Sequence, residues 1–455
     1  MSSNFYELLV ERFGEAPDAT AIKSEERGNW TYSELVRVAE RFAALLDAMG
    51  IEPGDRVAVQ TEKSPEAVFL YLACLRNGAV FLPLNTAYPA AELEFFLSDS
   101  EPRIFVCNPL KLKELEPLAS HLGIRIFSLG PDGSGTLTGK LKGDDPRQPV
   151  SREGSDLAAI IYTSGTTGRS KGAMITHDNL STNARTLHQQ WGFIPDDVLL
   201  HSLPIYHVHG LFVALHCALL NTSKIIWMNR FDAAEVIRRL PDSTVFMGVP
   251  THYTRLLAEK SFGSGSCSSM RLFVSGSAPL LPETFDGFRE RTGHTILERY
   301  GMTEAGMITS NPLAGERRAG TVGFPLADIS ARVCSDKGGE LKNGEIGILE
   351  IKGPNVFRGY WKLPQKTREE FREDGFFITG DLAVRDERGY ISIVGRGRDL
   401  VISGGLNVYP KEIEERLDLA DGVVESAVFG LPHDDLGEAV TAVVVMSIEL
   451  LLSVE

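Results

Sequence analysis

Hydrophobic and polar positions show two alternating patterns along the first three hundred residues, one typical of helices and one typical of strands. After the capping-box pattern formed by Thr31 and Glu34, apolar residues recur at helical spacing until Gly50. Short runs rich in β-branched residues alternate with such helical segments and occupy residues 55–60, 79–84, 103–106, 124–129, 156–162, 198–202, 225–228, 245–248 and 272–275. Strands that alternate with helices predict βαβ units and a mostly parallel sheet.

The pattern changes after about residue 328, where strands become shorter and turns more frequent. Short strands are predicted at 346–352, 376–378, 390–394, 423–429 and 439–445, with a short helix at 411–417. The polar, glycine-flanked segment 395–399 is typical of a hinge, which we place near Arg398. We therefore expect an α/β protein: a large N-terminal domain at 1–397, with mostly parallel sheets and a β-rich subdomain, then a small, truncated α+β domain at 398–455.

Charge and composition exclude several classes of function. The chain has 46 basic and 61 acidic residues, a net charge of −15, which disfavours a duplex nucleic-acid partner. No apolar run approaches the roughly 18 residues needed to span a bilayer, and the first residues do not form a secretory signal. The five cysteines are scattered, which is typical of a reducing compartment. We expect a cytoplasmic protein without a membrane span; the sequence leaves its oligomeric state open.

A loop rich in glycine and hydroxyl side chains follows the apolar run at 156–162. Such a loop offers backbone N–H groups and hydroxyls to a polyphosphate, and Lys171 adds a positive charge. It is not a Walker A loop, which needs glycine at the place of Ser170 and Ser or Thr directly after the lysine. A plain surface turn is the alternative for a short loop of this composition. The residues predicted to bind phosphate are Thr163, Ser164, Gly165, Thr166, Thr167, Gly168 and Lys171.

The stretch 162–172 resembles the phosphate-binding signature of the acyl-adenylate-forming enzymes, which include acyl-CoA synthetases, luciferases and peptide-synthetase adenylation domains. Further stretches match the same family in the same order, at 300–304, 379–381, 395–396, 403–405 and 409–414. The resemblance therefore does not rest on one motif. It implies an enzyme that joins a carboxylic acid to coenzyme A (CoA) through an acyl-adenylate, with ATP as co-substrate and AMP and pyrophosphate as products.

The resemblance also implies roles for individual residues. Thr303 is implied to contact the α-phosphate, and Glu304 is implied to hold Mg²⁺, a hard cation that prefers carboxylate oxygen. Taken alone, Glu304 would more simply be a helix cap, and Asp381 a turn residue. The implied ATP-binding residues beyond the loop are Tyr300, Gly301, Thr303, Asp381 and Arg396, and the implied CoA-binding residues are Gly404 and Gly405.

Three stretches of the sequence indicate which carboxylic acid is the substrate. Residues 201–210, 270–280 and 298–304 closely resemble the malonyl-CoA synthetases within this family. In that subfamily an arginine at the place of Arg271 is the implied partner of the distal carboxylate, and a guanidinium fork suits that task. The alternative is that Arg271 sits at a strand end and pairs with a surface acid. The predicted substrate-binding residues are His207, Arg271, Ser275, Gly276, Ser277 and Met302.

His207 and His209 have a spacing that could suit a metal. Without a nearby cysteine or a third histidine this is disfavoured. His207 is expected to line the acyl pocket and the path of the thiol, and is a catalytic candidate together with Thr303 and Glu304. Val208 stands where the subfamily often has threonine, which leaves the choice between malonate and methylmalonate open.

The C-terminal domain departs from the family. The family's lid ends with a lysine that reaches the α-phosphate and the carboxylate during adenylation. Here the last lysine is Lys411, and residues 446–455 match nothing in the family. We expect adenylation to be impaired. Two alternatives to malonate ligation remain: CoA ligation of another short-chain or dicarboxylic acid, and a non-catalytic remnant that only binds ATP and substrate.

Overall fold

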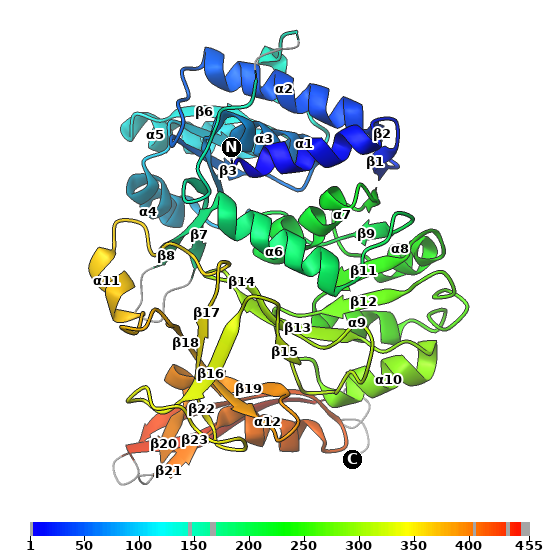
Figure 1. Ribbon diagram of the computed structural model, residues 1–455, viewed down its shortest axis with the longest axis vertical. Coiled ribbons are helices and arrows are strands. Elements are labelled where there is room, and N and C mark those ends of the chain that lie inside the picture. Colours follow the sequence, from blue (N-terminus) through cyan, green and yellow to red (C-terminus); the bar gives the residue numbers. More distant parts are fainter. Residues whose placement is uncertain (1–2, 144–147, 164–169, 404–405, 434–436, 447–455) are drawn as a thin grey trace, which may run out of the picture.

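Two largely parallel sheets form the upper and middle parts of the molecule in Figure 1. The computed structural model describes residues 3–143, 148–163, 170–403, 406–433 and 437–446. Sheet A has the strand order β15 (Phe324–Pro325), β14 (Gly306–Ser310), β13 (Leu297–Met302), β12 (Leu272–Ser275), β11 (Val245–Gly248), β9 (Val198–His201), β10 (Lys224–Trp227), β1 (Thr20–Ser24) and β2 (Gly28–Thr31). Sheet B has the order β6 (Arg125–Ser128), β5 (Ile104–Cys107), β3 (Arg56–Gln60), β4 (Val80–Pro83), β7 (Leu157–Thr163) and β8 (Lys171–Thr176).

Neighbouring strands run parallel through the interior of both sheets, as the sequence predicts. Antiparallel pairs occur at the edges, where β2 pairs with β1, β14 with β13 and β8 with β7. The central strands β11 and β12 are buried along their whole length, which explains why they read as continuous apolar runs in the sequence.

Helices surround and separate the two sheets. They are α1 (Phe5–Glu15), α2 (Tyr32–Ala48), α3 (Pro65–Asn77), α4 (Ala90–Ser100), α5 (Leu112–His121), α6 (His177–Gln190), α7 (His216–Leu220), α8 (Ala233–Arg239), α9 (Pro250–Ala258) and α10 (Pro282–Thr292). A π-helical segment, His209–Leu215, leads directly into α7. The predicted capping box is present: the Glu34 N–H donates to Thr31 Oγ1 at 3.2 Å, and the Thr31 N–H donates to Glu34 Oε2 at 2.9 Å. Figure 1 shows α6 and α7 between sheets A and B.

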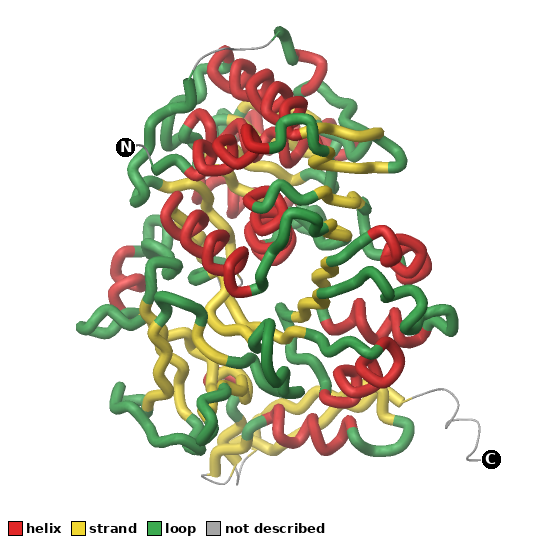
Figure 2. Tube along the Cα trace, turned by 45° about the vertical axis from the view of Figure 1, so that its right-hand side comes forward, coloured by secondary structure: helices red, strands yellow, loops and turns green. Residues whose placement is uncertain are grey.

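Two antiparallel sheets make up the rest of the molecule. Sheet C has the order β16 (Ser330–Cys334), β17 (Gly347–Lys352), β18 (Phe377–Arg385) and β19 (Ile391–Arg396), and α11 (Pro364–Glu369) lies between β17 and β18 in the sequence. The lid sheet has the order β21 (Leu406–Val408), β20 (Val401–Ser403), β23 (Gly437–Met446) and β22 (Val423–His433), with α12 (Pro410–Asp418) following β21 in the chain. Figure 2 shows helices around the upper sheets and at the lower right, whereas the lower left consists mainly of strands and loops.

The segment between sheet C and the lid sheet is short. Residues Gly397–Asp399 form a single 3₁₀ turn that joins β19 to β20. This is where the sequence predicts the hinge at Arg398, and hinge motion there stays a prediction. Because β9, β11, β12 and β13 are parallel, their carboxyl ends meet at one edge of sheet A, the edge at which α/β proteins bind their ligands.

Candidate active site

The β7–β8 hairpin holds the predicted phosphate loop. Thr163 and Lys171 are opposite each other at its mouth; Ser164, Gly165, Thr166, Thr167 and Gly168 lie outside the described residues. The Lys171 side chain is only 7% exposed, and its Nζ lies 3.0 Å from Oε1 of Glu370 and 4.3 Å from the centroid of the Tyr360 ring. The charged end of Lys171 is thus held at the base of the loop.

Tyr360 connects Lys171 to the predicted magnesium ligand. Its hydroxyl lies 2.9 Å from Glu370 Oε2 and 3.0 Å from Glu304 Oε1. Burial raises the pKa of Glu304 above its ordinary value. For Glu370, burial acts to raise the pKa, but the hydrogen bond and charge of Lys171 outweigh it and the net pKa is lowered. Glu370 belongs to the charged run 368–374, yet its side chain packs against the loop lysine.

Three of the implied ATP-binding residues, Tyr300, Asp381 and Arg396, come together from sheet A and sheet C. The Tyr300 hydroxyl donates a hydrogen bond to Asp381 Oδ2. Asp381 pairs with Arg396 across β18 and β19, and Arg396 Nε lies 3.3 Å from Asp381 Oδ1. Arg396 is half exposed, whereas Asp381 is buried. A carboxylate fixed in this way can accept hydrogen bonds from sugar hydroxyls.

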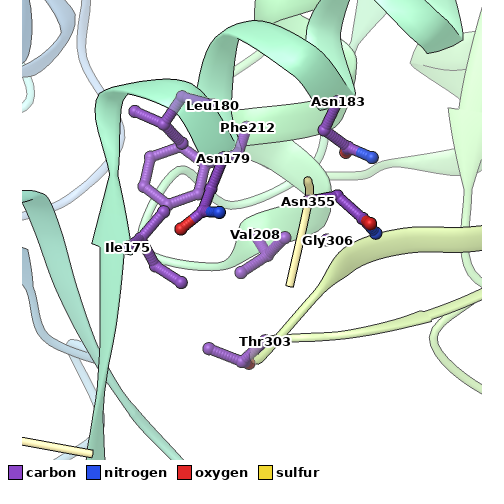
Figure 3. A pocket seen from close by; sticks show the side chains of 9 residues that line it. All are labelled: Ile175, Asn179, Leu180, Asn183, Val208, Phe212, Thr303, Gly306 and Asn355. Carbon is purple, nitrogen blue, oxygen red and sulfur yellow. The ribbon is translucent and has the colours of Figure 1, made fainter. Parts of the chain in front are cut away.

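A tight hairpin between β13 and β14 presents Thr303. Gly301 is required there, because a Cβ on it would lie 2.2 Å from the carbonyl oxygen of Gly306. Figure 3 shows Thr303 facing Val208 across a small cavity, with Phe212 behind. The cavity has a volume of about 20 Å³, enough for a water molecule but not for an acyl group. The suggestion that Val208 affects the choice between malonate and methylmalonate stays a prediction.

The structure gives Arg271 a partner other than the predicted substrate. Its guanidinium forms a two-pronged ion pair with Asp197, in which Nε lies 2.6 Å from Oδ1 and Nη2 contacts Oδ2. Arg271 precedes β12 and Asp197 precedes β9, so the pair lies at the amino ends of parallel strands. The binding edge is at their carboxyl ends, one strand length of about 13 Å away. The alternative interpretation, an arginine at a strand end that pairs with a surface acid, agrees with the strand end and the acid, but Asp197 is buried and not on the surface.

A different arginine occupies the binding edge. Arg299 on β13 is 3% exposed, and its Nε and Nη2 are buried with no hydrogen-bond partner among the described residues. Burial lowers the pKa of Arg299 to about 9. A Cβ on Gly276 would lie 2.5 Å from Cζ of Arg299, which places the guanidinium directly on the carboxyl end of β12. Sequence reasoning did not single out Arg299, although two adjacent charged residues, Glu298 and Arg299, directly after the apolar pair 296–297 were a visible signal.

Other predicted substrate-binding residues gather around Arg299. His209 Nδ1 lies 3.3 Å from Ser277 Oγ, and the His209 N–H donates to His207 Nδ1 at 3.2 Å. Burial, and then the charge of Arg299, hold the pKa of His209 well below its ordinary value. Ser275 is fully buried and its hydroxyl has no hydrogen-bond partner among the described residues. These groups form a polar cluster beside a buried cation.

The remaining predicted site residues have fewer contacts that bear on their predicted roles. Met302 ends β13, and the Tyr300 hydroxyl lies 4.0 Å from its sulfur. Within the described residues no cluster of His, Cys, Asp or Glu could hold a metal by itself. Mg²⁺ bound to a nucleotide usually takes only one or two carboxylates besides the phosphates, so Glu304 beside Thr303 still fits that ion. Gly404 and Gly405 lie outside the described residues.

Comparison with known proteins decides the family. The family model described as AMP-binding enzyme matches residues 9–361. The chain belongs to this family. A malonate–CoA ligase from Arabidopsis thaliana is 35% identical over 98% of this chain and 79% of its own length. A feruloyl-CoA synthase from an Amycolatopsis species is 34% identical over 96% of this chain and 87% of its own length.

Among solved structures, ATP-bound MatB from Rhodopseudomonas palustris is similar in sequence and fold. It is 52% identical, the match covers 98% of this chain and 89% of that chain, and the TM-score is 0.95. These relatives make this AMP-binding enzyme an acid–thiol ligase. In the described part of the chain, every helix is too short or too polar to cross a membrane.

Proposed function

We propose that this AMP-binding enzyme ligates malonate to CoA, with ATP as the second substrate. The observation that carries the proposal is Arg299, a buried guanidinium at the carboxyl edge of sheet A, two of whose nitrogens have no hydrogen-bond partner among the described residues. A dicarboxylic acid supplies the missing counter-charge with its distal carboxylate while the other carboxylate reacts. Similarity to a malonate–CoA ligase and to MatB supports the same substrate.

Selection for an acid with a second carboxylate follows from the desolvation of Arg299. A guanidinium fork binds a carboxylate in a bidentate manner. A monocarboxylic acid would leave Arg299 buried and unpaired, which costs about 3–4 kcal/mol and corresponds to about 10²–10³ in selectivity. The neutral rings of His207 and His209 add hydrogen-bonding groups without adding charge. His207 accepts a hydrogen bond at Nδ1, so its neutral form carries the proton at Nε2 and can donate to the substrate.

The reaction needs two displacements. In the first, a carboxylate oxygen of malonate attacks the α-phosphorus of ATP and pyrophosphate leaves. Thr303 contacts the α-phosphate, Lys171 offsets the charge of the leaving phosphates, and Asp381 with Arg396 holds the ribose. Mg²⁺ held by Glu304 would neutralise phosphate charge. In the second displacement the CoA thiolate attacks the acyl carbon and AMP leaves.

The proposal is tested by product analysis. The purified protein is incubated with Mg-ATP and CoA together with malonate, methylmalonate or acetate, and the adenylates and thioesters are followed by mass spectrometry. Malonyl-AMP or malonyl-CoA well above the acetate background is the expected result. Equal or greater product from acetate would contradict malonate as the substrate.

Two alternatives have their own outcomes in this experiment. The feruloyl-CoA synthase shows that relatives at this identity can be named for a different acid, and a different acid here would give a thioester from that acid alone. A non-catalytic remnant would bind ATP, detected by calorimetry, and give no adenylate with any acid.

A further inference from the structure

Lys63 is a buried cation that the reaction described above does not use. It lies in the loop between β3 and α3, directly before Ser64, and is 6% exposed. Its Nζ donates hydrogen bonds to the carbonyl oxygens of His201, at 2.8 Å, and Met228, at 2.7 Å. These carbonyls lie at the carboxyl ends of β9 and β10 in sheet A, whereas Lys63 follows a strand of sheet B. One ammonium group therefore fixes two strand ends from the opposite sheet.

An aromatic ring completes the surroundings of Lys63. Its Nζ lies 4.4 Å from the centroid of the Trp227 ring, and that ring stacks on His201 with centroids 5.6 Å apart and an interplanar angle of 11°. The three N–H groups of the ammonium are thus directed at two carbonyls and one π face. Burial holds the pKa of Lys63 well below its ordinary value. A buried lysine is costly, so its position here needs a reason.

His201 connects Lys63 to the loop that lies beside Arg299. Its Nε2 donates to the carbonyl oxygen of Gly210 at 3.0 Å, which ties together the two ends of the loop at residues 202–210. The loop is folded tightly, because a Cβ on Gly210 would lie 2.0 Å from the carbonyl oxygen of Pro204. This loop carries His207 and His209, the rings next to Ser277 and Arg299.

We propose that Lys63 is a positioning residue for the proposed carboxylate site around Arg299. It fixes the ends of β9 and β10 and, through His201, the loop that presents His207 and His209. Lys63 does not touch the substrate. Its role in substrate use rests on the proposed malonate ligation, whereas its role in holding the loop does not. Losing Lys63 is expected to loosen residues 202–210 and weaken malonate binding, and to leave the ATP side of the site, built from β8, β13 and sheet C, unchanged.

Three variants separate these effects. Lys63→Met removes the donors and the charge, Lys63→Gln keeps two N–H donors without the charge, and Lys113→Met removes an exposed lysine on α5 as the matched control. Amide hydrogen exchange is followed by mass spectrometry in peptides covering 202–210 and, for comparison, β13 and β14. The KM for malonate and the Kd for ATP are measured on the same preparations.

Faster exchange confined to 202–210 in Lys63→Met, with Lys113→Met like the parent, is the expected result. The KM for malonate should rise about tenfold, as for loss of hydrogen bonds to a charged group, with the Kd for ATP within about twofold. Unchanged exchange at 202–210, or parallel losses for malonate and ATP, would overturn the inference. If Lys63→Met does not fold, Lys63→Gln decides by the same criteria. If the parent protein does not use malonate, the substrate proposal fails, and the exchange result alone decides the role of Lys63.

Discussion

The guanidinium of Arg299 lies directly against the backbone of Gly276, so close that a Cβ at Gly276 would come within 2.5 Å of its Cζ. Gly276 follows β12 and Arg299 lies on β13, two parallel neighbours in sheet A. The absence of a side chain at residue 276 therefore gives the cation its place at the binding edge.

Gly276→Ala is expected to displace Arg299 and to raise the KM for malonate at least about tenfold, because a bidentate contact does not survive a shift of this size. The Kd for ATP should stay within about twofold. Steady-state kinetics with malonate as the varied substrate, together with ATP titration calorimetry, checks this. Gly287→Ala on α10, where a Cβ meets only the end of a leucine side chain at 4.0 Å, is the control. An unchanged malonate KM in Gly276→Ala would mean that the Arg299 contact is not used.

Arg271→Met is expected to act on stability and not on substrate choice. Asp197 is fully buried, and removing its partner leaves an uncompensated charge at a cost of about 3 kcal/mol or more. Urea unfolding of Arg271→Met should show a lower midpoint, and the double variant Arg271→Met, Asp197→Asn should recover much of the loss. A normal midpoint in the single variant would show that the ion pair contributes little.

Glu298 predicts a pH dependence of stability. Burial raises the pKa of Glu298 to about 8, and its Oε2 has no hydrogen-bond partner among the described residues. The unfolded chain has an ordinary carboxyl pKa of about 4.3, so the folded state binds more protons between these values. The contribution of Glu298 to the free energy of unfolding is therefore complete below about pH 4.3 and is lost as the pH rises toward about 8.

Glu298→Gln removes this dependence. The variant should resemble the parent near pH 4.5 and be more stable than the parent at pH 8, measured by urea midpoints. Glu290→Gln, an exposed acid on α10, is the matched control. A variant less stable than the parent at pH 8 would show that Glu298 is charged and satisfied in the folded protein.

The effect of a lid lysine on the adenylation step can be measured directly. The family resemblance implies a lysine late in the lid, and these 455 residues contain none after Lys411. Appending a C-terminal segment that carries this lysine should raise the rate of malonyl-AMP formation by about 10²–10³, the usual effect of one transition-state donor. Single-turnover rates, with lysine-to-alanine changes in the appended segment as controls, measure this. Equal rates with and without the segment would contradict the prediction.

Local patterns in the sequence predicted much of the fold. The capping box at Thr31 and the apolar runs that became β11 and β12 depend on neighbouring residues alone, so they can be read along the chain. Of the residues in the family motifs, Tyr300 and Asp381 contact each other in the structure, and the roles of Tyr300, Asp381 and Lys171 toward ATP stay predictions.

The roles of the two arginines could not be read in the same way. The contacts of each arginine depend on the tertiary fold. Arg271 pairs with Asp197, 74 residues away in the sequence, and Arg299 lies against Gly276, which follows the neighbouring strand. The position of Arg271 before its strand did hold a usable hint, because the amino end of a parallel strand is the wrong edge for a ligand. No sequence motif points to Lys63, and only the packing of sheet B on sheet A shows that it is buried.

The most direct test of the central claim compares malonate with acetate in the parent, Arg299→Met and Arg271→Met. The ratio of kcat/KM values for the two acids, from ATP–pyrophosphate exchange, is independent of the fraction of folded enzyme. We predict that Arg299→Met lowers the malonate-to-acetate ratio by about 10²–10³ and that Arg271→Met leaves it within about twofold. A ratio that collapses in Arg271→Met and survives in Arg299→Met would contradict the account.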